Sequence, residues 1–294
     1  MDTADLALFV QAAASGGLSE AARRLGVSPA AASRRLAALE GRLGARLMHR
    51  TTRSLSLTPE GEAFLPHAQA VLEAEAAARE SLAPLGSRRV SGLLRVTAPA
   101  AFGRKVVGPL MPRFVAAHPE LRVDLQLTDS VVDIVAAGID VAVRIGQPRD
   151  SSLIARRLAA NRRVLCAAPS YLVRAGAPRT LRDLARHECL PLSGVARWTF
   201  VDADGRAREA RVSGRFASSS VEALHAACLG GLGLTLLSEW DVAEELADGR
   251  LVEIALDAGL PQELAIWAIY PTSRLVPPKV RAFVVELERT VSRR

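Results

Sequence analysis

Three residue types are scarce in this 294-residue sequence, which has three cysteines, two lysines and only 4% aromatic residues. Cys166, Cys189 and Cys228 lie far apart and lack the close spacing of metal ligands, so we interpret them as reduced thiols. The five histidines are scattered as well, and no glycine-rich phosphate loop is followed by Lys-Ser or Lys-Thr. The sequence therefore predicts no metal site, no cofactor and no catalytic residues, and we do not expect an enzyme.

Long apolar runs are also missing. The longest, around residues 226–237, is interrupted by three glycines and is too short to span a bilayer as a helix. Asp2 and Asp5 make the start of the sequence acidic, whereas a secretory signal begins with basic residues. We expect a soluble cytoplasmic protein without a membrane partner.

The positive charge is almost all arginine and is concentrated near the N-terminus. The formal net charge is +7, and the first 58 residues hold eight arginines against four acidic residues. Guanidinium groups suit bidentate contacts with phosphate and guanine. A GC-rich genome would enrich arginine too, so composition alone leaves the partner open. The length and the 49% hydrophobic content suffice for two or three domains with buried cores.

Three short helices are predicted at the N-terminus. Apolar residues at helical spacing predict the first, which ends at Gly16-Gly17. Ser19 is a candidate N-cap for a second helix over residues 20–25, which Gly26 closes. Ser28, followed by Pro29 in the first turn, is the candidate N-cap of the third. Two helices joined by a tight turn, the second basic in its N-terminal half, form a helix-turn-helix.

The outward face of the third helix carries small residues and one long arginine, which suits close approach to a DNA groove. Residues 50–53 are basic and rich in hydroxyls, and residues 54–57 alternate in polarity, which predicts a short β-wing along the phosphate backbone or minor groove. The alternative is a small helical domain that only packs on the rest of the chain. The predicted DNA-contacting residues are Ser28, Pro29, Ala30, Ala31, Ser33, Arg34, Arg35, Arg50, Thr51, Thr52 and Arg53.

A long helix is predicted from Pro59 to about residue 85, with Thr58 as its N-cap and a kink at Pro66. Its apolar residues recur at spacings typical of a coiled-coil seam, which favours dimerisation. The alternative is a seam that packs within its own chain. The predicted dimerisation residues are Phe64, Ala68, Val71, Ala78 and Leu82.

Beyond a hinge-like stretch at residues 84–92, strands and helices alternate. Expected strands at 93–97, 121–127 and 141–145, with helices at 102–117 and 131–137, predict a parallel sheet covered by helices. A second unit starts near residue 163, with a hairpin at residues 202–205, and residues 262–270 return to the first unit. We expect two lobes, lobe I over about 92–162 and 267–294 and lobe II over about 163–266, with a cleft between them.

In such sheets, ligands bind beyond the carboxyl ends of the strands and near helix N-termini. Three stretches satisfy this rule: residues 97–100, 128–129 and 218–220. The last also predicts a capping box in which Ser219 is the N-cap and Glu222 follows three residues later. The alternative for each stretch is an ordinary cap or turn. The predicted effector-binding residues are Thr97, Ala98, Pro99, Ala100, Thr128, Asp129, Ser218, Ser219 and Ser220.

A series of short motifs runs through the N-terminal segment: Ala21-Ala22-Arg23-Arg24-Leu25, Val27-Ser28, Ser33-Arg34-Arg35-Leu36, Leu39-Glu40, Leu43-Gly44, Leu47, Arg50 and Leu57-Thr58 with Glu60-Gly61. This pattern resembles the LysR-type transcriptional regulators over about the first 65 residues, and more loosely over the whole chain. Two stretches depart from the family pattern: residues 29–32 are less polar than in many members, and Ala98 and Ala100 stand where some members carry hydroxyls.

The resemblance implies a fold of mixed α+β and α/β class: a winged helix-turn-helix over 1–58, a linker and dimerisation helix with hinge over 59–91, and a two-lobed effector domain similar to periplasmic binding proteins over 92–294. It implies double-stranded operator DNA, a small-molecule effector and a homodimer or homotetramer as partners, with RNA polymerase as a further candidate. A second hypothesis is a small-molecule binding module whose N-terminal helices serve oligomerisation only.

Overall fold

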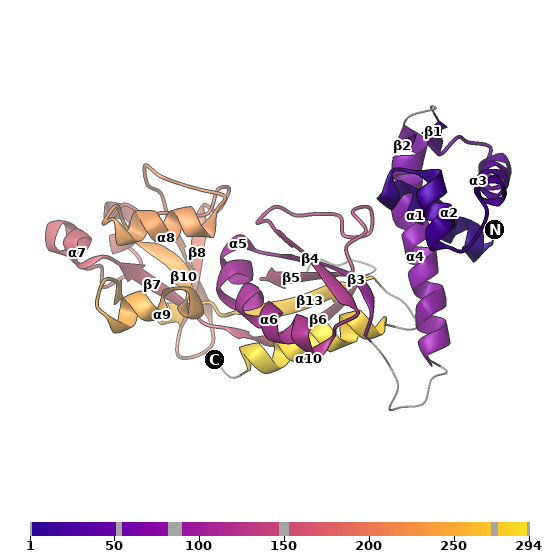
Figure 1. Ribbon diagram of the computed structural model, residues 1–294. Coiled ribbons are helices and arrows are strands. Elements are labelled where there is room, and N and C mark those ends of the chain that lie inside the picture. Colours follow the sequence, from indigo (N-terminus) through magenta and orange to yellow (C-terminus); the bar gives the residue numbers. More distant parts are fainter. Residues whose placement is uncertain (1, 51–54, 82–89, 147–152, 272–275, 293–294) are drawn as a thin grey trace. The chain divides into compact units, whose positions relative to one another are not determined.

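The computed structural model describes residues 2–50, 55–81, 90–146, 153–271 and 276–292 (Figure 1). The chain divides into two compact units. The N-terminal unit is formed mainly by residues up to Val90, and the C-terminal unit by most of the chain from Ser91 onward. Each unit is described by itself.

Three helices form the core of the N-terminal unit: α1 (Thr3–Ser15), α2 (Leu18–Arg24) and α3 (Pro29–Leu43). The predicted ends hold for α1, which Gly16 terminates at φ 64°, and for α3, where the Ser28 side chain accepts a hydrogen bond from the Ala31 N–H at 3.2 Å. The predicted start of α2 is wrong, because Gly17 is the N-cap and Ser19 lies inside the helix. The earlier start brings Leu18 against the shared core.

The wing is a two-stranded hairpin of β1 (Met48–Arg50) and β2 (Leu55–Leu57), whose predicted tip residues Thr51, Thr52 and Arg53 lie outside the described residues. After the wing in the chain, α4 (Pro59–Ser81) begins at the predicted cap, Thr58. The Thr58 hydroxyl accepts a hydrogen bond from the Gly61 N–H at 3.0 Å and donates one to the Arg46 carbonyl at 2.6 Å. Thr58 therefore fixes the wing to the start of α4.

Part of the predicted dimerisation seam on α4 is used within the chain. The ring of Phe64 lies 5.7 Å from that of Phe9 on α1, and Ala68 is buried in the same core. This packing follows the alternative in which the seam covers its own chain, because α1 presents the nearest apolar face. Val71 and Ala78 are exposed, and Leu82 lies outside the described residues.

Lobe I of the C-terminal unit is a five-stranded sheet in the order β4-β3-β5-β13-β6. As predicted, β3 (Gly92–Ala98), β4 (Leu121–Leu127) and β5 (Val141–Ile145) are parallel. The crossing strand β13 (Leu264–Tyr270) pairs antiparallel with both β5 and β6 (Ile154–Asn161), so the sheet is mixed.

The helices of lobe I differ from prediction in two places. The expected helix at 102–117 consists of α5 (Ala100–Phe102), a π-helical segment (Gly103–Val107) and α6 (Gly108–Ala117). The helix expected at 131–137 is wrong: the segment forms turns, the Asp133 carboxylate accepts hydrogen bonds from the N–H groups of Val135 and Ala136, and Val131 is 82% exposed. Residues 131, 134 and 135 would share one face of a helix, but Ile134 is buried whereas Val135, like Val131, is exposed, so the segment lacks a continuous buried face. The last helix, α10 (Pro278–Val291), lies beside α6 through the rings of Phe114 and Phe283 (Figure 1).

Lobe II contains two three-stranded antiparallel sheets, β10-β7-β11 and β12-β8-β9. The predicted hairpin at 202–205 joins β8 to β9. The predicted capping box of Ser219 and Glu222 is wrong, because Ser220, whose backbone is extended, caps α8 through the Ala223 N–H, and Glu222 binds Arg104 instead. The strands are β7 (Arg163–Ala167), β8 (Arg197–Val201), β9 (Ala207–Arg211), β10 (Thr235–Ser238), β11 (Val252–Glu253) and β12 (Leu260–Pro261), and the helices are α7 (Pro169–Ala175), a 3-10 turn (Asp183–Arg186), α8 (Val221–Leu229) and α9 (Glu239–Ala247).

Among the described residues, no helix combines the length and the apolar character that crossing a membrane would require.

Candidate functional site

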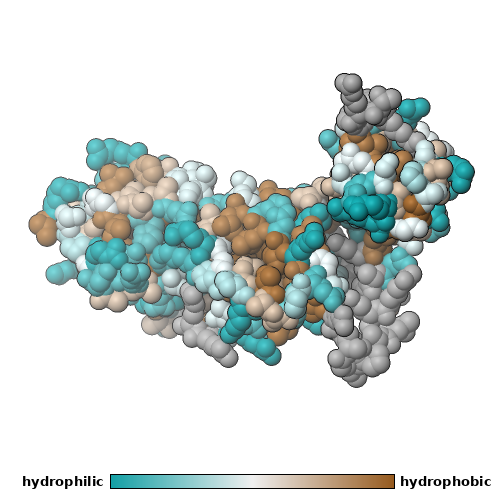
Figure 2. Space-filling view, in the orientation of Figure 1, coloured by the Kyte–Doolittle hydropathy of each residue, from teal (hydrophilic) through white to brown (hydrophobic). Residues whose placement is uncertain are grey.

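The outward face of α3 presents most of the predicted DNA-contacting residues to solvent. Its inner face is buried through Ala32, Leu36 and Leu39, which fixes the rotation of the helix. The visible surface of the N-terminal unit mixes hydrophilic, weakly hydropathic and some hydrophobic residues (Figure 2). Ser28, Pro29, Ala30, Arg34 and Arg35 are exposed, while Ala31 and Ser33 are half-buried.

The two arginines of α2 form ion pairs with a carboxylate of the protein, whereas the two of α3 form none among the described residues. Arg23 and Arg24 both bind the Glu20 carboxylate, at 2.7 and 2.9 Å, and their side-chain hydrogen bonds lower the pKa of Glu20. Within the part of the chain that the structure describes, neither Arg34 nor Arg35 forms an ion pair. The pair on α3 is therefore available to a polyanion, whereas Glu20 balances part of the charge on α2.

Two further contacts hold α3 in place. Arg42 near its C-terminal end bonds Asp5 of α1 at 2.5 Å, and the Glu40 carboxylate accepts hydrogen bonds from the N–H groups of Leu47 and Met48. Helix and wing are thus connected through side chains of α3. Arg50 ends β1, and the other predicted wing contacts lie outside the described residues.

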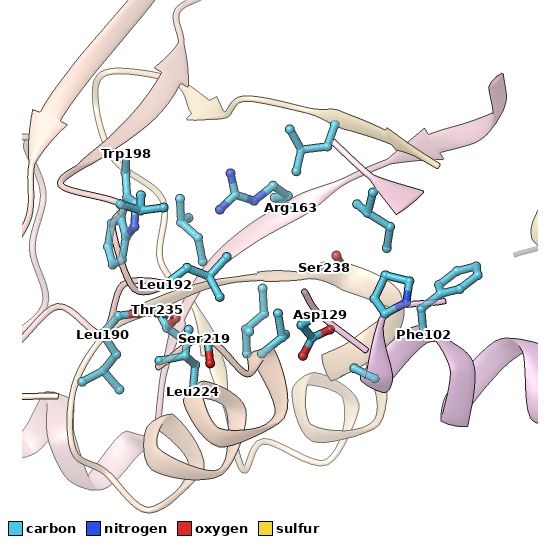
Figure 3. Close-up of a pocket in the computed structure, with 18 of the residues that line it drawn as sticks. Phe102, Asp129, Arg163, Leu190, Leu192, Trp198, Ser219, Leu224, Thr235 and Ser238 are labelled. Carbon is cyan, nitrogen blue, oxygen red and sulfur yellow. Dashed lines mark hydrogen bonds between the residues drawn. The ribbon is translucent and has the colours of Figure 1, made fainter. Parts of the chain in front are cut away.

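In the C-terminal unit, residues from both lobes line a cleft with a cavity of about 360 Å³ (Figure 3). Its walls are mainly apolar, with Phe102 from lobe I and Leu190, Leu192, Trp198 and Leu224 from lobe II. The volume falls in the range of small-molecule sites, which are mostly apolar with a few placed polar groups. The cleft therefore suits a small organic ligand.

Of the predicted effector-binding residues, Pro99, Thr128, Asp129 and Ser219 line this cleft. The Asp129 carboxylate accepts a hydrogen bond from the Ala100 N–H at 3.0 Å, so a side chain of the protein already binds the N-terminus of α5.

The remaining predicted positions serve the fold. Thr97 and Ala98 are buried within β3, and the Thr97 hydroxyl accepts a hydrogen bond from Arg144 at 3.4 Å. Ser218 accepts a hydrogen bond from the Ser220 N–H, and Ser220 caps α8. The alternative of an ordinary cap therefore describes Ser220.

Sequence reasoning missed the charged and aromatic residues that give the cleft its character: Arg144, Arg163, Trp198 and Trp240. Arg144 donates to the carbonyl of Val143 at 2.8 Å and lies near Asp129. Burial lowers the pKa of Arg163, and it lowers the pKa of Arg144 against the opposing effect of Asp129. One signal was present in the sequence, since Arg163 is a charged residue at the start of an otherwise buried strand.

Two ion pairs connect the lobes beside the cleft, both from the π-helical segment. The exposed Arg104 binds Glu222 of α8 at 2.7 Å, and Lys105 binds the buried Asp241 of α9 at 2.8 Å. His225 lies 3.4 Å from Asp241. Burial acts to raise the pKa of Asp241, but hydrogen bonds from His225 and Lys105 outweigh burial and lower it.

Known proteins match both units. Residues 3–62 match the model of the bacterial regulatory helix-turn-helix protein, lysR family, and residues 87–292 match the LysR substrate binding domain. The HTH-type transcriptional regulator DmlR of Escherichia coli is 37% identical over 95% of this chain and 91% of its own length. PtxR of Pseudomonas aeruginosa, also an HTH-type transcriptional regulator, is 37% identical over 97% of this chain and 91% of its own length.

The structure of CrgA, a LysR-type transcriptional regulator from Neisseria meningitidis, superimposes with a TM-score of 0.62, 31% identity and 99% coverage of both chains. A full-length OxyR variant from Pseudomonas aeruginosa has a TM-score of 0.67 at 20% identity, over 98% of this chain and 94% of its own, and shows the shared fold alone.

Proposed function

The chain belongs to the LysR-type transcriptional regulators, with a helix-turn-helix DNA-binding domain and an effector-binding domain, and we propose that α3 reads operator DNA while a small molecule in the cleft controls the outcome. In this proposal residues 1–58 bind DNA, 59–91 link and dimerise, and 92–294 bind the effector. The cleft binds its ligand without transforming it, and the protein works in the cytoplasm.

One observation carries the DNA-binding assignment: the exposed face of α3 offers Arg34 and Arg35 without an ion pair among the described residues, next to the small side chains of Ala30 and Ala31. Small side chains let a helix enter the major groove, and arginine contacts guanine or phosphate there. In this assignment Ser28, Pro29 and Ser33 contact DNA from the same end of α3, and Arg35, Arg50, Thr51, Thr52 and Arg53 contact the phosphate backbone.

We assign dimerisation to the exposed Val71 and Ala78 of α4 and to Leu82, which lies outside the described residues, since Phe64 and Ala68 are used within the chain. A two-fold dimer matches an operator with two half-sites, and a tetramer doubles this arrangement. Effector binding between the lobes then alters the arrangement of the subunits and, through it, DNA bending or contact with RNA polymerase.

The competing hypothesis is a binding module whose N-terminal helices only oligomerise the chain. Oligomerisation needs the seam on α4 but does not need an unpaired basic face on α3. Salt dependence separates the two hypotheses, because specific operator binding survives at salt concentrations that abolish nonspecific binding.

The test is binding of the purified full-length protein to its own upstream intergenic DNA and to random DNA of equal length, each titrated with salt. We expect tight, selective binding over two half-sites. Arg34→Ala should weaken specific binding and relax selectivity at one base position, by about 1–3 kcal/mol. Arg53→Ala should weaken binding to all sequences and reduce the salt slope.

Arg23→Ala is a matched control, because Glu20 already binds that arginine. Weak binding that is equal for both DNAs and disappears at moderate salt would favour the binding-module hypothesis. Unchanged operator affinity in Arg34→Ala and Arg53→Ala would show that DNA lies on another face.

A further inference from the structure

We propose that the effector is a small organic carboxylate with an apolar body, and that its carboxylate pairs with the guanidinium of Arg163. This inference rests on the proposed effector function of the cleft and specifies the chemical class of the ligand. It follows from the state of the four charged residues that line the cleft, Asp129, Arg144, Arg163 and Arg197.

Arg163 is a partly buried cation without a counter-charge. It is the first residue of β7, and Figure 3 shows its guanidinium extending into the cleft on the side of Trp198. Within the described residues its side chain has neither an ion pair nor a hydrogen bond, and burial alone lowers its pKa. Removing a charge from water without pairing it is costly, so the site is set up for an anion that arrives with the ligand.

The other cleft charges already have partners. Arg197 binds Glu209 at 2.9 Å. Arg144 donates to the Val143 carbonyl and the Thr97 hydroxyl, and the nearby Asp129 carboxylate, which accepts from the Ala100 N–H, offsets its charge. Among the described charged residues of the cleft, Arg163 is thus the one whose side chain has neither a hydrogen bond nor a nearby carboxylate that offsets its charge.

The neighbouring Arg162, at the same crossing between the lobes, is an arginine whose charge is paired with carboxylates of the protein. It is exposed and binds the carboxylates of Glu239 and Glu253 at 2.5 and 2.7 Å. The two adjacent residues therefore differ in burial and in pairing: the exposed Arg162 binds two carboxylates of lobe II, and none binds the partly buried Arg163. Since the planar guanidinium fork fits a carboxylate with two parallel hydrogen bonds, a ligand carboxylate fills this gap directly.

The apolar lining determines the rest of the ligand. Leu190, Leu192, Leu224 and Trp198 line the same cavity as Arg163. Its volume of about 360 Å³ accommodates a small organic molecule. A single unpaired guanidinium in an apolar cleft favours one carboxylate over a phosphate, whose higher charge and stronger hydration would be left uncompensated. An aromatic or branched aliphatic acid fits this description.

The experiment is isothermal titration calorimetry on the full-length protein without DNA. The probes are benzoate and hexanoate, their uncharged amides benzamide and hexanamide, and inorganic phosphate. We expect at least one acid to bind while its amide and phosphate do not. Arg163→Met should weaken that binding about ten- to a hundredfold, the usual range for losing a charged hydrogen-bonded pair. Arg163→Lys should recover part of the affinity, because it restores charge without the fork.

Arg197→Met is the matched control, since it removes an arginine from the same cleft that Glu209 already binds; its affinity should stay within about twofold of the wild type. Binding of the amides or of phosphate as tightly as the acids would overturn the proposal. Failure of both acids to bind at millimolar concentration, or equal loss of affinity in both arginine variants, would overturn it as well.

A second measurement does not depend on the choice of probe. If Arg163 is unpaired in the free protein, Arg163→Met should unfold at a temperature at least as high as the wild type. A marked fall in the unfolding temperature of Arg163→Met, without a similar fall in Arg197→Met, would show that Arg163 is structural and contradict the proposal. Operator binding is measured separately, so its success beside a failed titration would reject the carboxylate and leave the DNA-binding function intact.

Discussion

The arginines on α3 and the arginine at the centre of the cleft carry the same charge in different surroundings. Arg34 and Arg35 are exposed, whereas Arg163 is partly buried among apolar residues. An exposed charge keeps its hydration, and salt screens its attraction to DNA. A partly buried charge has lost part of its hydration, which costs free energy, and salt screens it far less. It therefore binds fewer ligands with more selectivity.

This difference teaches how the molecule divides two tasks. The face of α3 leaves its charges in water, and in the proposed function these charges attract any DNA while small side chains and shape add selectivity. The cleft instead holds Arg144 and Arg163 partly out of water, and Arg163 has no ion pair among the described residues. Experiments that alter buried and exposed charges in parallel therefore test whether burial is the property that separates the two regions.

The largest effect is expected from Lys105→Met. The substitution leaves the Asp241 carboxylate, whose side chain is only 1% exposed, without its 2.8 Å partner, and breaking such a buried pair costs about 3–5 kcal/mol of unfolding free energy. Chemical denaturation of the full-length protein measures it. The control is Arg104→Met, which removes the adjacent, exposed ion pair between the same lobes and should cost at most about 1 kcal/mol. Equal losses would mean that burial does not distinguish these two pairs.

The same carboxylate makes stability depend on acid. The pKa of Asp241 is lowered from 3.8 in the folded protein, so its stabilisation is complete above about that pH and is lost as the pH falls through the lowered value. Lys105→Met removes one of the groups that lower this pKa, so the loss should begin at a higher pH than in the wild type. Unfolding temperatures followed from neutral to acidic pH measure the shift. Superimposable acid profiles would contradict the assignment to Asp241.

Gly61→Ala tests close packing in the N-terminal unit. A methyl group at Gly61 would collide with the backbone carbonyl of Leu47, which ties α4 to the wing, so we expect a loss of about 1–3 kcal/mol. Gly41→Ala is the control: its methyl group meets open space on an exposed face of α3, and it should stabilise the helix by about 1 kcal/mol. Thermal unfolding measures both changes in stability. If both substitutions destabilised the protein to a similar extent, the contact with Leu47 would not be the cause.

Local patterns in the sequence predict which face of α3 is exposed, because short-range geometry determines it. The cap at Ser28 closes on Ala31, and the buried stripe of α3 follows from helical spacing. The wing and the start of α4 depend on equally short signals around Thr58 and Pro59. The seam on α4 was only partly predictable, since an apolar stripe does not say which surface will cover it.

The cleft is built by contacts between distant residues, which local patterns do not reveal. Asp129 reaches the Ala100 N–H across 29 positions, and Lys105 meets Asp241 across 136. The rule on strand ends and helix starts predicted Pro99, Thr128 and Ser219, which line the cleft, but whether an arginine is paired depends on which carboxylate the fold brings near it. The same limit explains the wrong helix at 131–137, where Asp133 stabilises turns and Ile134 is buried while Val131 and Val135 are exposed.

The smallest effect is expected from comparing Arg35→Gln with Arg24→Gln. Arg35 has no ion pair within the described residues, whereas Arg24 binds Glu20 at 2.9 Å. If Arg35 contacts a phosphate, its removal should reduce the slope of log affinity against log salt by about 0.9. Arg24→Gln should change the slope less, because Glu20 already competes for that guanidinium. Binding to random DNA over a range of salt concentrations measures both slopes. Equal reductions of the two salt slopes would show that the ion pair with Glu20 does not keep Arg24 from binding DNA. The difference in pairing between the arginines of α2 and those of α3 would then not determine which of them bind DNA.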